Sequence, residues 1–255
     1  MEPILAQSII ISISLVGFAV WGLLAFFSRR SELGIRDQKR FVTISGIYLL
    51  GWLLLTSLIG YAGAFQVTPS TRFPPIALGI GTTLLAGIVL LQRSRLLGTV
   101  VRAIPIEWLV GIQVYRVFGL FFLALFTSGG LPAEFALPAG YGDVAVGLAA
   151  PVVAYAAYKG FRRSSLAVWS WNSFAATDLV VAVTLGFLSS PGQFHVIALA
   201  NPNLLVTAYP LVLVPVFAVP LSMLLHIATF KRLTAQTAAT FDQLQSGRSV
   251  PGGAH

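Results

Sequence analysis

Two charged side chains lie deep inside long apolar runs of this sequence. Arg116 is near the middle of the run 108–126, and Asp178 is near the middle of the run 166–187. A charge at the centre of a bilayer costs roughly a few to more than ten kcal/mol, so such residues are rare and usually paired or functional. Because both lie at nearly the same depth in their runs, we predict a salt bridge between them.

Other polar side chains in the apolar runs extend this pair to a predicted ligand-binding or proton-handling site. Gln113 lies three residues before Arg116 and therefore shares its helical face. Asp143 is expected about one turn inside the start of its segment. The candidate residues are Arg116, Asp143, Asp178, Gln113, Asn172 and Tyr209.

The charges of this site indicate its chemistry. One arginine faces two carboxylates, so the excess negative charge needs a proton, a cation or water. A carboxylate that burial keeps protonated can carry protons across a membrane. The guanidinium could instead bind a small anionic ligand.

The composition predicts a membrane protein. Of the 255 residues, 56% are hydrophobic and only 9% are charged, whereas soluble domains carry about 25% charged residues. The formal charge of +8 would suggest a nucleic-acid partner in a soluble protein, but the basic residues lie in short loops between apolar segments. This placement indicates membrane topology, so we expect the lipid bilayer and no nucleic acid as partner.

Seven apolar segments are long enough to cross a hydrocarbon core of about 30 Å. The sequence thus predicts an all-α, polytopic bundle of seven transmembrane helices. The segments are 4–28, 42–64, 74–92, 106–127, 139–158, 165–189 and 204–230. The first is too long for the apolar part of a cleaved signal, so we expect it to be retained as an anchor.

Basic residues predict the orientation. Fourteen of the sixteen Lys and Arg residues fall in alternate loops and the tail, one (Arg72) falls in the opposite loops, and one (Arg116) is left inside a segment. By the positive-inside rule the N-terminus is outside and the C-terminus cytoplasmic. We therefore predict a multi-pass protein of the plasma membrane or bacterial inner membrane.

The chain divides into a predicted transmembrane domain, 1–230, and a short polar cytoplasmic tail, 231–255, in which we expect a short helix followed by a frayed end. Prolines inside two segments predict kinks. Pro151 deprives the Gly147 carbonyl of its helical donor, and Pro220 does the same for Val216. The fifth and seventh helices should therefore bend.

Several chemistries are disfavoured by the residues present. The chain has no cysteine, and its three lysines all fall at the cytoplasmic side, which excludes a retinal pigment with a buried lysine. The three histidines fall in different regions, with His226 expected at the inner membrane interface, so no metal, haem or other cofactor is predicted. A Ser-His-Asp hydrolase is disfavoured for the same reason.

The segment Gly140-Tyr-Gly-Asp143 resembles the Gly-x-Gly-Asp motif of intramembrane aspartyl proteases. In those proteases two membrane-embedded aspartates share a proton and activate water. This sequence departs from their pattern, because the second aspartate, Asp178, follows the motif instead of preceding it. Arg116 would also hold Asp178 ionised, which opposes proton sharing.

The leading functional prediction is a small transporter or ligand-binding bundle, with its site between the fourth and seventh helices and with movement of the kinked helices. A second hypothesis is a non-catalytic receptor or assembly subunit of a membrane complex, in which the buried ion pair is a structural clamp. An intramembrane aspartyl hydrolase is the third. The sequence favours a protein without enzymatic activity.

Overall fold

The computed structural model describes residues 2–248, and this part of the chain is helical, without strands. The long helices are α1 (Pro3–Ser28), α2 (Ile35–Tyr61), α3 (Pro75–Arg93), α7 (Ala133–Tyr158), α8 (Ser164–Ser189) and α9 (Val219–Arg248). Shorter elements are α4 (Arg95–Ala103), α5 (Ile106–Gly111), the 3₁₀ segment η1 (Ile112–Gly119), α6 (Leu120–Thr127), the 3₁₀ turn η2 (Leu205–Thr207) and the π-helical segment η3 (Val214–Ala218).

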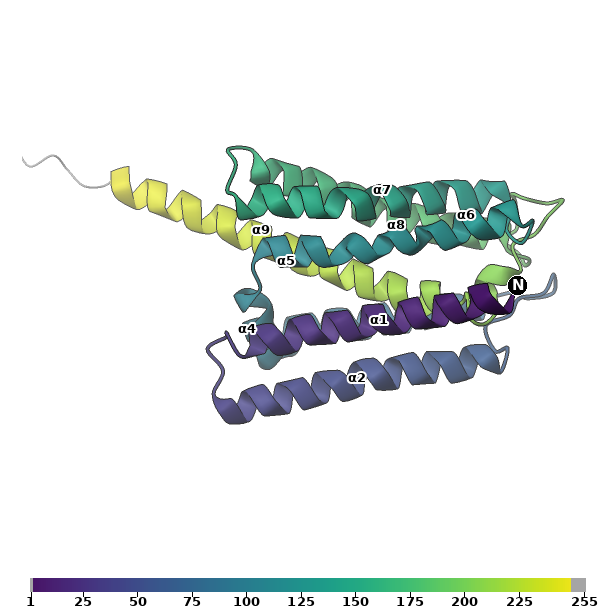
Figure 1. The fold of residues 1–255 in the computed structure, drawn as a ribbon, viewed down its shortest axis with the longest axis horizontal. Helices are drawn as coiled ribbons and strands as arrows, with labels where there is room; N and C mark the ends of the chain where they lie inside the picture. The colour runs from purple at the N-terminus through teal and green to yellow at the C-terminus, as the bar shows by residue number, and fades with distance from the viewer. Residues whose placement is uncertain (1, 249–255) are drawn as a thin grey trace, which may run out of the picture.

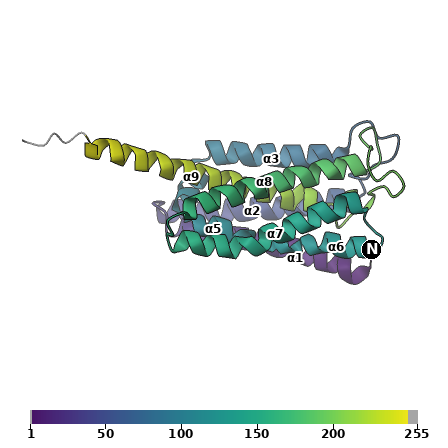
Figure 2. The same cartoon turned by 90° about the horizontal axis from the view of Figure 1, so that it is seen from above.

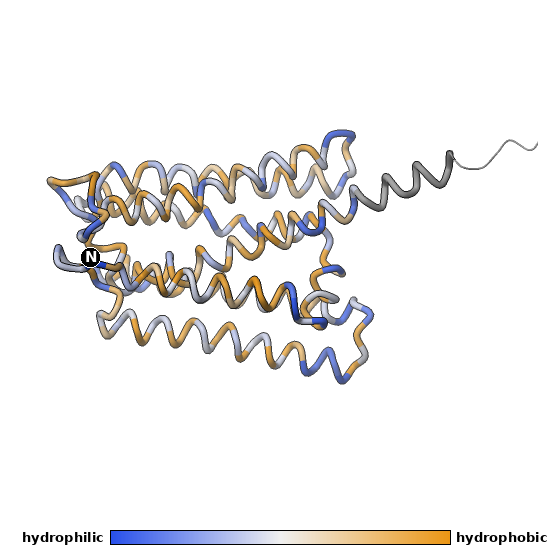
Figure 3. The backbone as a smooth tube through the Cα atoms, turned by 180° about the vertical axis from the view of Figure 1, so that it is seen from behind, coloured by the Kyte–Doolittle hydropathy of each residue, from blue (hydrophilic) through white to orange (hydrophobic). Residues whose placement is uncertain are grey.

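The structure contains as many helices suited to span a membrane as the sequence predicted. Within the described residues, seven helical stretches are long and apolar enough to cross a membrane. Two of them are composite, since α5, η1 and α6 together form Ile106–Thr127, and η3 continues into α9 to give Val214–Thr237. Hydrophilic residues gather toward the ends of the bundle, while apolar residues follow the helical shafts (Figure 3).

The helices form an elongated bundle. In Figure 1, α7 and α8 lie along one edge and α2 lies along the other, and α9 runs obliquely between them and extends past one end. Figure 2 shows α3 and α1 on opposite sides of the bundle. The α1–α2 loop, α4 and the α7–α8 loop all lie at the end of the bundle beyond which α9 extends. We call this the basic end, because these segments and the adjoining ends of α2, α3 and α9 carry most of the basic residues. We call the other the distal end.

Two predicted helix boundaries are wrong at the distal end. The fifth segment was expected to begin at residue 139, after Pro138, but α7 begins at Ala133. A proline near a helix start removes only one backbone hydrogen bond, so the helix continues through Pro138. The seventh segment was expected from residue 204, but residues 204–212 form turns and η2.

The end of α8 is joined to this irregular segment by Asn203. Its amide Nδ2 donates to Ser189 Oγ at 3.3 Å, and its Oδ1 accepts from the backbone N–H of Val206 at 3.3 Å. Asn203 is fully buried. It therefore caps η2.

The predicted free carbonyl before Pro220 is present and has a donor. The indole Nε1 of Trp52, on α2, donates to Val216 O at 3.2 Å in the bundle interior. Trp52 also packs on Phe217, with ring centroids 4.7 Å apart. Because a buried carbonyl without a donor is costly in lipid, this contact stabilises the proline-containing segment and joins α2 to it.

The predicted helix in the tail is confirmed, but it is not a separate element. α9 continues without a break from Val219 to Arg248. The predicted frayed end began with Ser246, but α9 includes residues 246–248, and the remainder lies outside the described residues.

Candidate functional site

Arg116 forms ion pairs with two aspartates. Its Nη2 lies 2.6 Å from Asp143 Oδ1 and 2.5 Å from Asp178 Oδ2, and its Nε donates to Asp143 Oδ1 at 2.6 Å. The predicted contact between Arg116 and Asp178 is confirmed. We had matched the depth of Arg116 to Asp178 alone, and that view of Asp143 is wrong. Since α7 begins at Ala133, Asp143 lies ten residues into the helix, at the level of Arg116.

All five N–H groups of the guanidinium have an acceptor. Besides the two carboxylates, Nη1 donates to the backbone carbonyl of Ala175 at 2.9 Å and lies 3.5 Å from His226 Nε2. The Arg116 side chain is 1% exposed, whereas the side chains of Asp143 and Asp178 are 15% and 10% exposed. The carboxylates, not the arginine, are therefore the accessible groups of the cluster.

Glycines on α7 and η1 allow this close approach. A Cβ at Gly119 would overlap Asp143 and lie 3.0 Å from Gly140 O, while a Cβ at Gly147 would lie 2.5 Å from Val117 N. Gly142 directly precedes Asp143 on α7, and a Cβ at this position would overlap the Asp178 carboxylate. Small residues at these positions let the backbones touch, so the glycines position the charged groups.

The 3₁₀ winding of η1 places its buried residues in one row. In a 3₁₀-helix residues three apart eclipse one another, and Gln113, Arg116 and Gly119 are the buried residues of η1. The predicted shared face of Gln113 and Arg116 is confirmed. Gln113 is fully buried, and its Nε2 donates to Ser222 O at 3.3 Å.

His226 belongs to the same network, although we expected it at the membrane interface. It is fully buried. Its ring Nδ1 lies 2.8 Å from Asn172 Oδ1, and Asn172 Nδ2 donates to the His226 carbonyl at 3.1 Å. Because Asn172 uses its amide as donor, its oxygen must accept, so Nδ1 of His226 carries the proton.

The other ring nitrogen of His226 is then an acceptor. Nε2 faces two donors, Gln113 Nε2 at 3.2 Å and Arg116 Nη1 at 3.5 Å. A proton on Nε2 would place three donors against one another, so the ring is neutral here. The cluster of Arg116, Asp143 and Asp178 therefore carries one unbalanced negative charge when both carboxylates are ionised.

One buried polar atom of this network has no partner. Gln113 Oε1 makes no hydrogen bond among the described residues. Turning the amide over would place this oxygen against Ser222 O, which is also an acceptor, so the orientation is fixed. An unpaired buried acceptor costs about 1–3 kcal/mol, and it marks a position for a water molecule or a proton donor.

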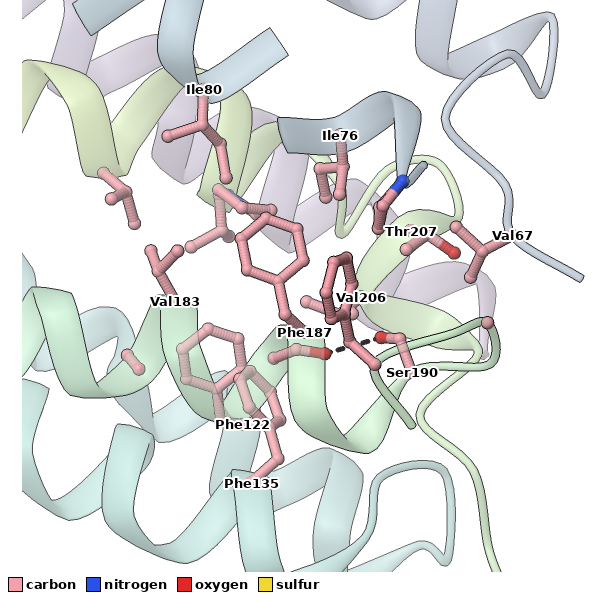
Figure 4. A pocket seen from close by; sticks show the side chains of 18 of the residues that line it. Val67, Ile76, Ile80, Phe122, Phe135, Val183, Phe187, Ser190, Val206 and Thr207 are labelled. Atoms are coloured by element: carbon pink, nitrogen blue, oxygen red, sulfur yellow. Dashed lines mark hydrogen bonds between the residues drawn. The ribbon is translucent and has the colours of Figure 1, made fainter. Parts of the chain in front are cut away.

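Two small cavities meet at Asp143. One, of about 40 Å³, is lined mostly by apolar side chains and extends from Asp143 toward the loops of the distal end, including Ser190 and Phe194. In Figure 4, Phe122 and Phe135 lie on one side of it and Ile76 and Ile80 on the other, with Phe187 between them. The second, of about 50 Å³, also touches Arg116, Tyr115 and Ser222. Each has room for a few water molecules.

Five of the six candidate residues therefore meet at the centre of the bundle, and the sixth does not. Tyr209 packs instead against Tyr61, with ring centroids 5.8 Å apart, near the distal end. Its segment is irregular, whereas the predicted seventh helix included it. His226 and Ser222 were missed. Ser222, Leu225, His226 and Thr229 are three or four residues apart and therefore share one helical face. In an apolar segment this spacing alone does not indicate that the face is buried against other helices.

The arrangement offers no evident metal site. Among the described residues, no group of three or more His, Cys, Asp and Glu side chains is placed to hold a metal ion. The geometry suits protons and charge pairing.

Residues 73–234 match the family described as Domain of unknown function (DUF8737). The matched region runs from the residues just before α3 into α9, and it contains the whole charged cluster. No curated protein matches the chain. No solved structure matches it either.

Proposed function

The chain belongs to the family of DUF8737 proteins, and we propose that it is a membrane carrier with a proton-binding site formed by Arg116, Asp143 and Asp178. The observation that carries the proposal is the sharing of one guanidinium by two carboxylates in the interior of a helix bundle. An unbalanced charge is expensive within a membrane. Binding one proton neutralises the cluster.

The free carboxylate oxygens are suited to this proton. Asp143 Oδ2 and Asp178 Oδ1 have no hydrogen-bond donor among the described residues, whereas the other oxygen of each pairs with Arg116. The cavities at Asp143 would supply water from the distal end, which the positive-inside rule places outside the cell. A proton entering by this path reaches Asp143 first.

The kinked elements supply places for movement. η1 and η3 interrupt the two composite helices at the level of the cluster, and such mid-helix departures from α-geometry often mark functional hinges. Neutralising a carboxylate would weaken its attraction to Arg116. Protonation would thereby loosen η1 from α7 or α8 and couple proton binding to a change of the bundle.

Anion binding at Arg116 and aspartyl hydrolysis receive less support. An anionic ligand would have to displace one of the four acceptor atoms that already saturate the guanidinium. In an aspartyl protease the two carboxylates share a proton and a water molecule. Here Arg116 Nη2 lies between Asp143 Oδ1 and Asp178 Oδ2, at 2.6 and 2.5 Å, in the position that the shared water would need.

The second candidate function is the structural clamp of a receptor or of a membrane-complex subunit. It is favoured by the 1% exposure of the Arg116 side chain and by its complete set of acceptors. The two candidates differ in one respect. A clamp needs the ion pairs only for folding, whereas a carrier also needs a carboxylate that gains and loses a proton.

The test is proton entry into liposomes that contain the purified protein and a trapped pH-sensitive dye, driven by a potassium gradient with valinomycin. We expect proton entry with the wild type and its loss in Asp143→Asn and Asp178→Asn. The control is Glu134→Gln, in the first turn of α7, which should retain it. Infrared difference spectra should show one protonated carboxyl group that the responsible Asp→Asn variant lacks.

The carrier proposal fails if the wild type admits no protons above empty liposomes and shows no protonated carboxyl group. It also fails if both Asp→Asn variants match the wild type in flux. A combined Arg116→Asp and Asp178→Arg variant that restores folding, in a protein without proton flux, would establish the clamp instead.

A further inference from the structure

A larger cavity lies away from the charged cluster, toward the basic end. It has a volume of about 430 Å³, within the range of roughly 300–1,000 Å³ typical of small-molecule sites. Its walls come from α1, α2, α3, α4, α5 and α9, and nearly all lining side chains are apolar. None of the residues of the Arg116 cluster lines it.

The shape of the cavity follows the helices around it. α2 packs against α1, and α3 packs against α9, and the cavity lies between these two pairs. Two of its lining residues, Ile44 on α2 and Leu90 on α3, are 53% and 39% exposed. The cavity therefore opens sideways, between α2 and α3, onto the surface that faces lipid in a membrane.

The depth of the cavity fits one acyl chain. Its lining on α2 runs from Arg40, near the basic end, to Trp52 in the middle of the helix. At 1.5 Å per residue this is about 18 Å, close to half of a hydrocarbon core about 30 Å thick. An acyl chain of the leaflet at the basic end would thus fill the cavity along its length.

Helix α4 closes the basic end with one apolar and one polar face. Leu96, Leu97 and Val101 line the cavity, while Arg95 and Arg102 are exposed. A helix of this kind lies in the membrane interface with its basic residues among the headgroups. The mouth of the cavity is therefore at headgroup level.

The charge at the mouth favours an anion. Arg40 lines the cavity and is exposed, and among the described residues the only ion pairs are those of Arg116. Ser45 and Ser94 also line the cavity as possible hydrogen-bond donors. An apolar channel with an unpaired guanidinium at its mouth matches an amphiphile with an anionic head and an acyl tail.

We propose that this cavity binds an anionic phospholipid of the membrane, with one acyl chain between α2 and α3 and the phosphate on Arg40. The site is separate from the proposed proton-binding site, so either can be refuted without the other. Because the lipid would join two helix pairs that otherwise leave a gap, it completes the packing of this half of the bundle.

The test is native mass spectrometry of the delipidated protein in detergent, titrated with phosphatidylglycerol or with phosphatidylcholine of the same acyl chains. We expect one phosphatidylglycerol to bind tightly and phosphatidylcholine more weakly. Arg40→Gln should reduce phosphatidylglycerol binding about fivefold, the effect of one basic residue at an anionic membrane surface. Arg36→Gln, exposed one turn earlier and outside the cavity, is the matched control.

The cavity itself is tested by filling it. Ser45→Phe should abolish tight binding. Ile47 is 68% exposed on the outer face of the same helix, so Ile47→Phe should leave tight binding intact. If Ser45→Phe unfolds, Leu90→Trp at the exposed mouth serves instead. Equal binding of both lipids, equal effects of Arg40→Gln and Arg36→Gln, or tight binding to a folded cavity-filled variant would each overturn the proposal.

Discussion

Gly142→Ala tests whether the two carboxylates really share Arg116. A Cβ at Gly142 would overlap Asp178 Oδ1 and lie 2.6 Å from its Cγ, whereas carbon atoms in contact are about 3.5–4.0 Å apart. The carboxylate must therefore move by about 1 Å. Because Oδ2 is 2.5 Å from Arg116 Nη2, that movement breaks the ion pair or separates α7 from α8.

The expected loss lies between two known effects. Overpacking of a core costs about 1–3 kcal/mol, and breaking a buried ion pair costs about 3–5 kcal/mol. Since Arg116 would keep Asp143, we expect Gly142→Ala to lower the free energy of unfolding by about 2–4 kcal/mol. The assay is denaturant-induced loss of helical circular dichroism in detergent micelles.

The matched control changes stability in the opposite direction. Gly51 lies in α2, and a Cβ there would meet nothing within 4 Å. Alanine is favoured over glycine inside a helix by about 0.5–1 kcal/mol, so Gly51→Ala should be neutral or stabilising. If Gly142→Ala behaves like Gly51→Ala, the deduced packing of Asp178 on Gly142 is refuted.

A double-mutant cycle isolates the cause. In an Asp178→Ala background the carboxylate is absent, so Gly142→Ala should cost less than about 1 kcal/mol. The coupling energy should then reach about 1–3 kcal/mol, as for residues in direct contact. A full cost in that background would assign the effect to α7–α8 packing alone.

Four further substitutions, with one exposed control, probe the same interior by the same unfolding assay. Arg116→Gln should destabilise by about 3–5 kcal/mol, because it leaves two carboxylates unpaired, while Asp178→Asn should cost less, because Arg116 and Asp143 remain a balanced pair; the opposite order would contradict this charge count. His226→Phe should lower the free energy of unfolding by about 1–3 kcal/mol for each buried polar group that loses its partner, beginning with Asn172 Oδ1. Trp52→Phe should cost a similar amount through Val216 O, whereas Trp108→Phe, at a 50% exposed position, should have little effect. A similar loss in both tryptophan variants would show that the indole hydrogen bond is unimportant.

Much of the architecture follows from apolar length alone, and so does one tertiary contact. Seven segments of sufficient length predicted seven candidate spans. The contact between Arg116 and Asp178 followed from matching depths, because a buried charge needs an opposite charge at its own level. Pro220 predicts that the Val216 carbonyl needs a donor from outside its own helix, but the sequence does not indicate that this donor is Trp52.

The remaining features depend on information that local sequence lacks. Asp143 was placed too near the helix end because Pro138 was taken as the start, whereas α7 extends to Ala133. His226 lies near the end of its apolar segment, and only the packing of α9 against α8 and η1 turns it inward. Pattern and periodicity locate a residue along a helix, but tertiary contacts determine its neighbours.

The winding of η1 has a mechanical consequence. A 3₁₀-helix rises about 2.0 Å per residue and an α-helix about 1.5 Å, so the eight residues of η1 store about 4 Å of extra length. Rewinding the segment to α-geometry would draw α6 toward the basic end by that amount. It would also rotate Arg116 relative to α5 by about 20° for each rewound residue before it. Shortening of η1 and rotation of Arg116 are thus coupled. The ion pair between Arg116 and Asp143 is thereby linked to the position of Phe122, on α6, in the wall of the distal cavity.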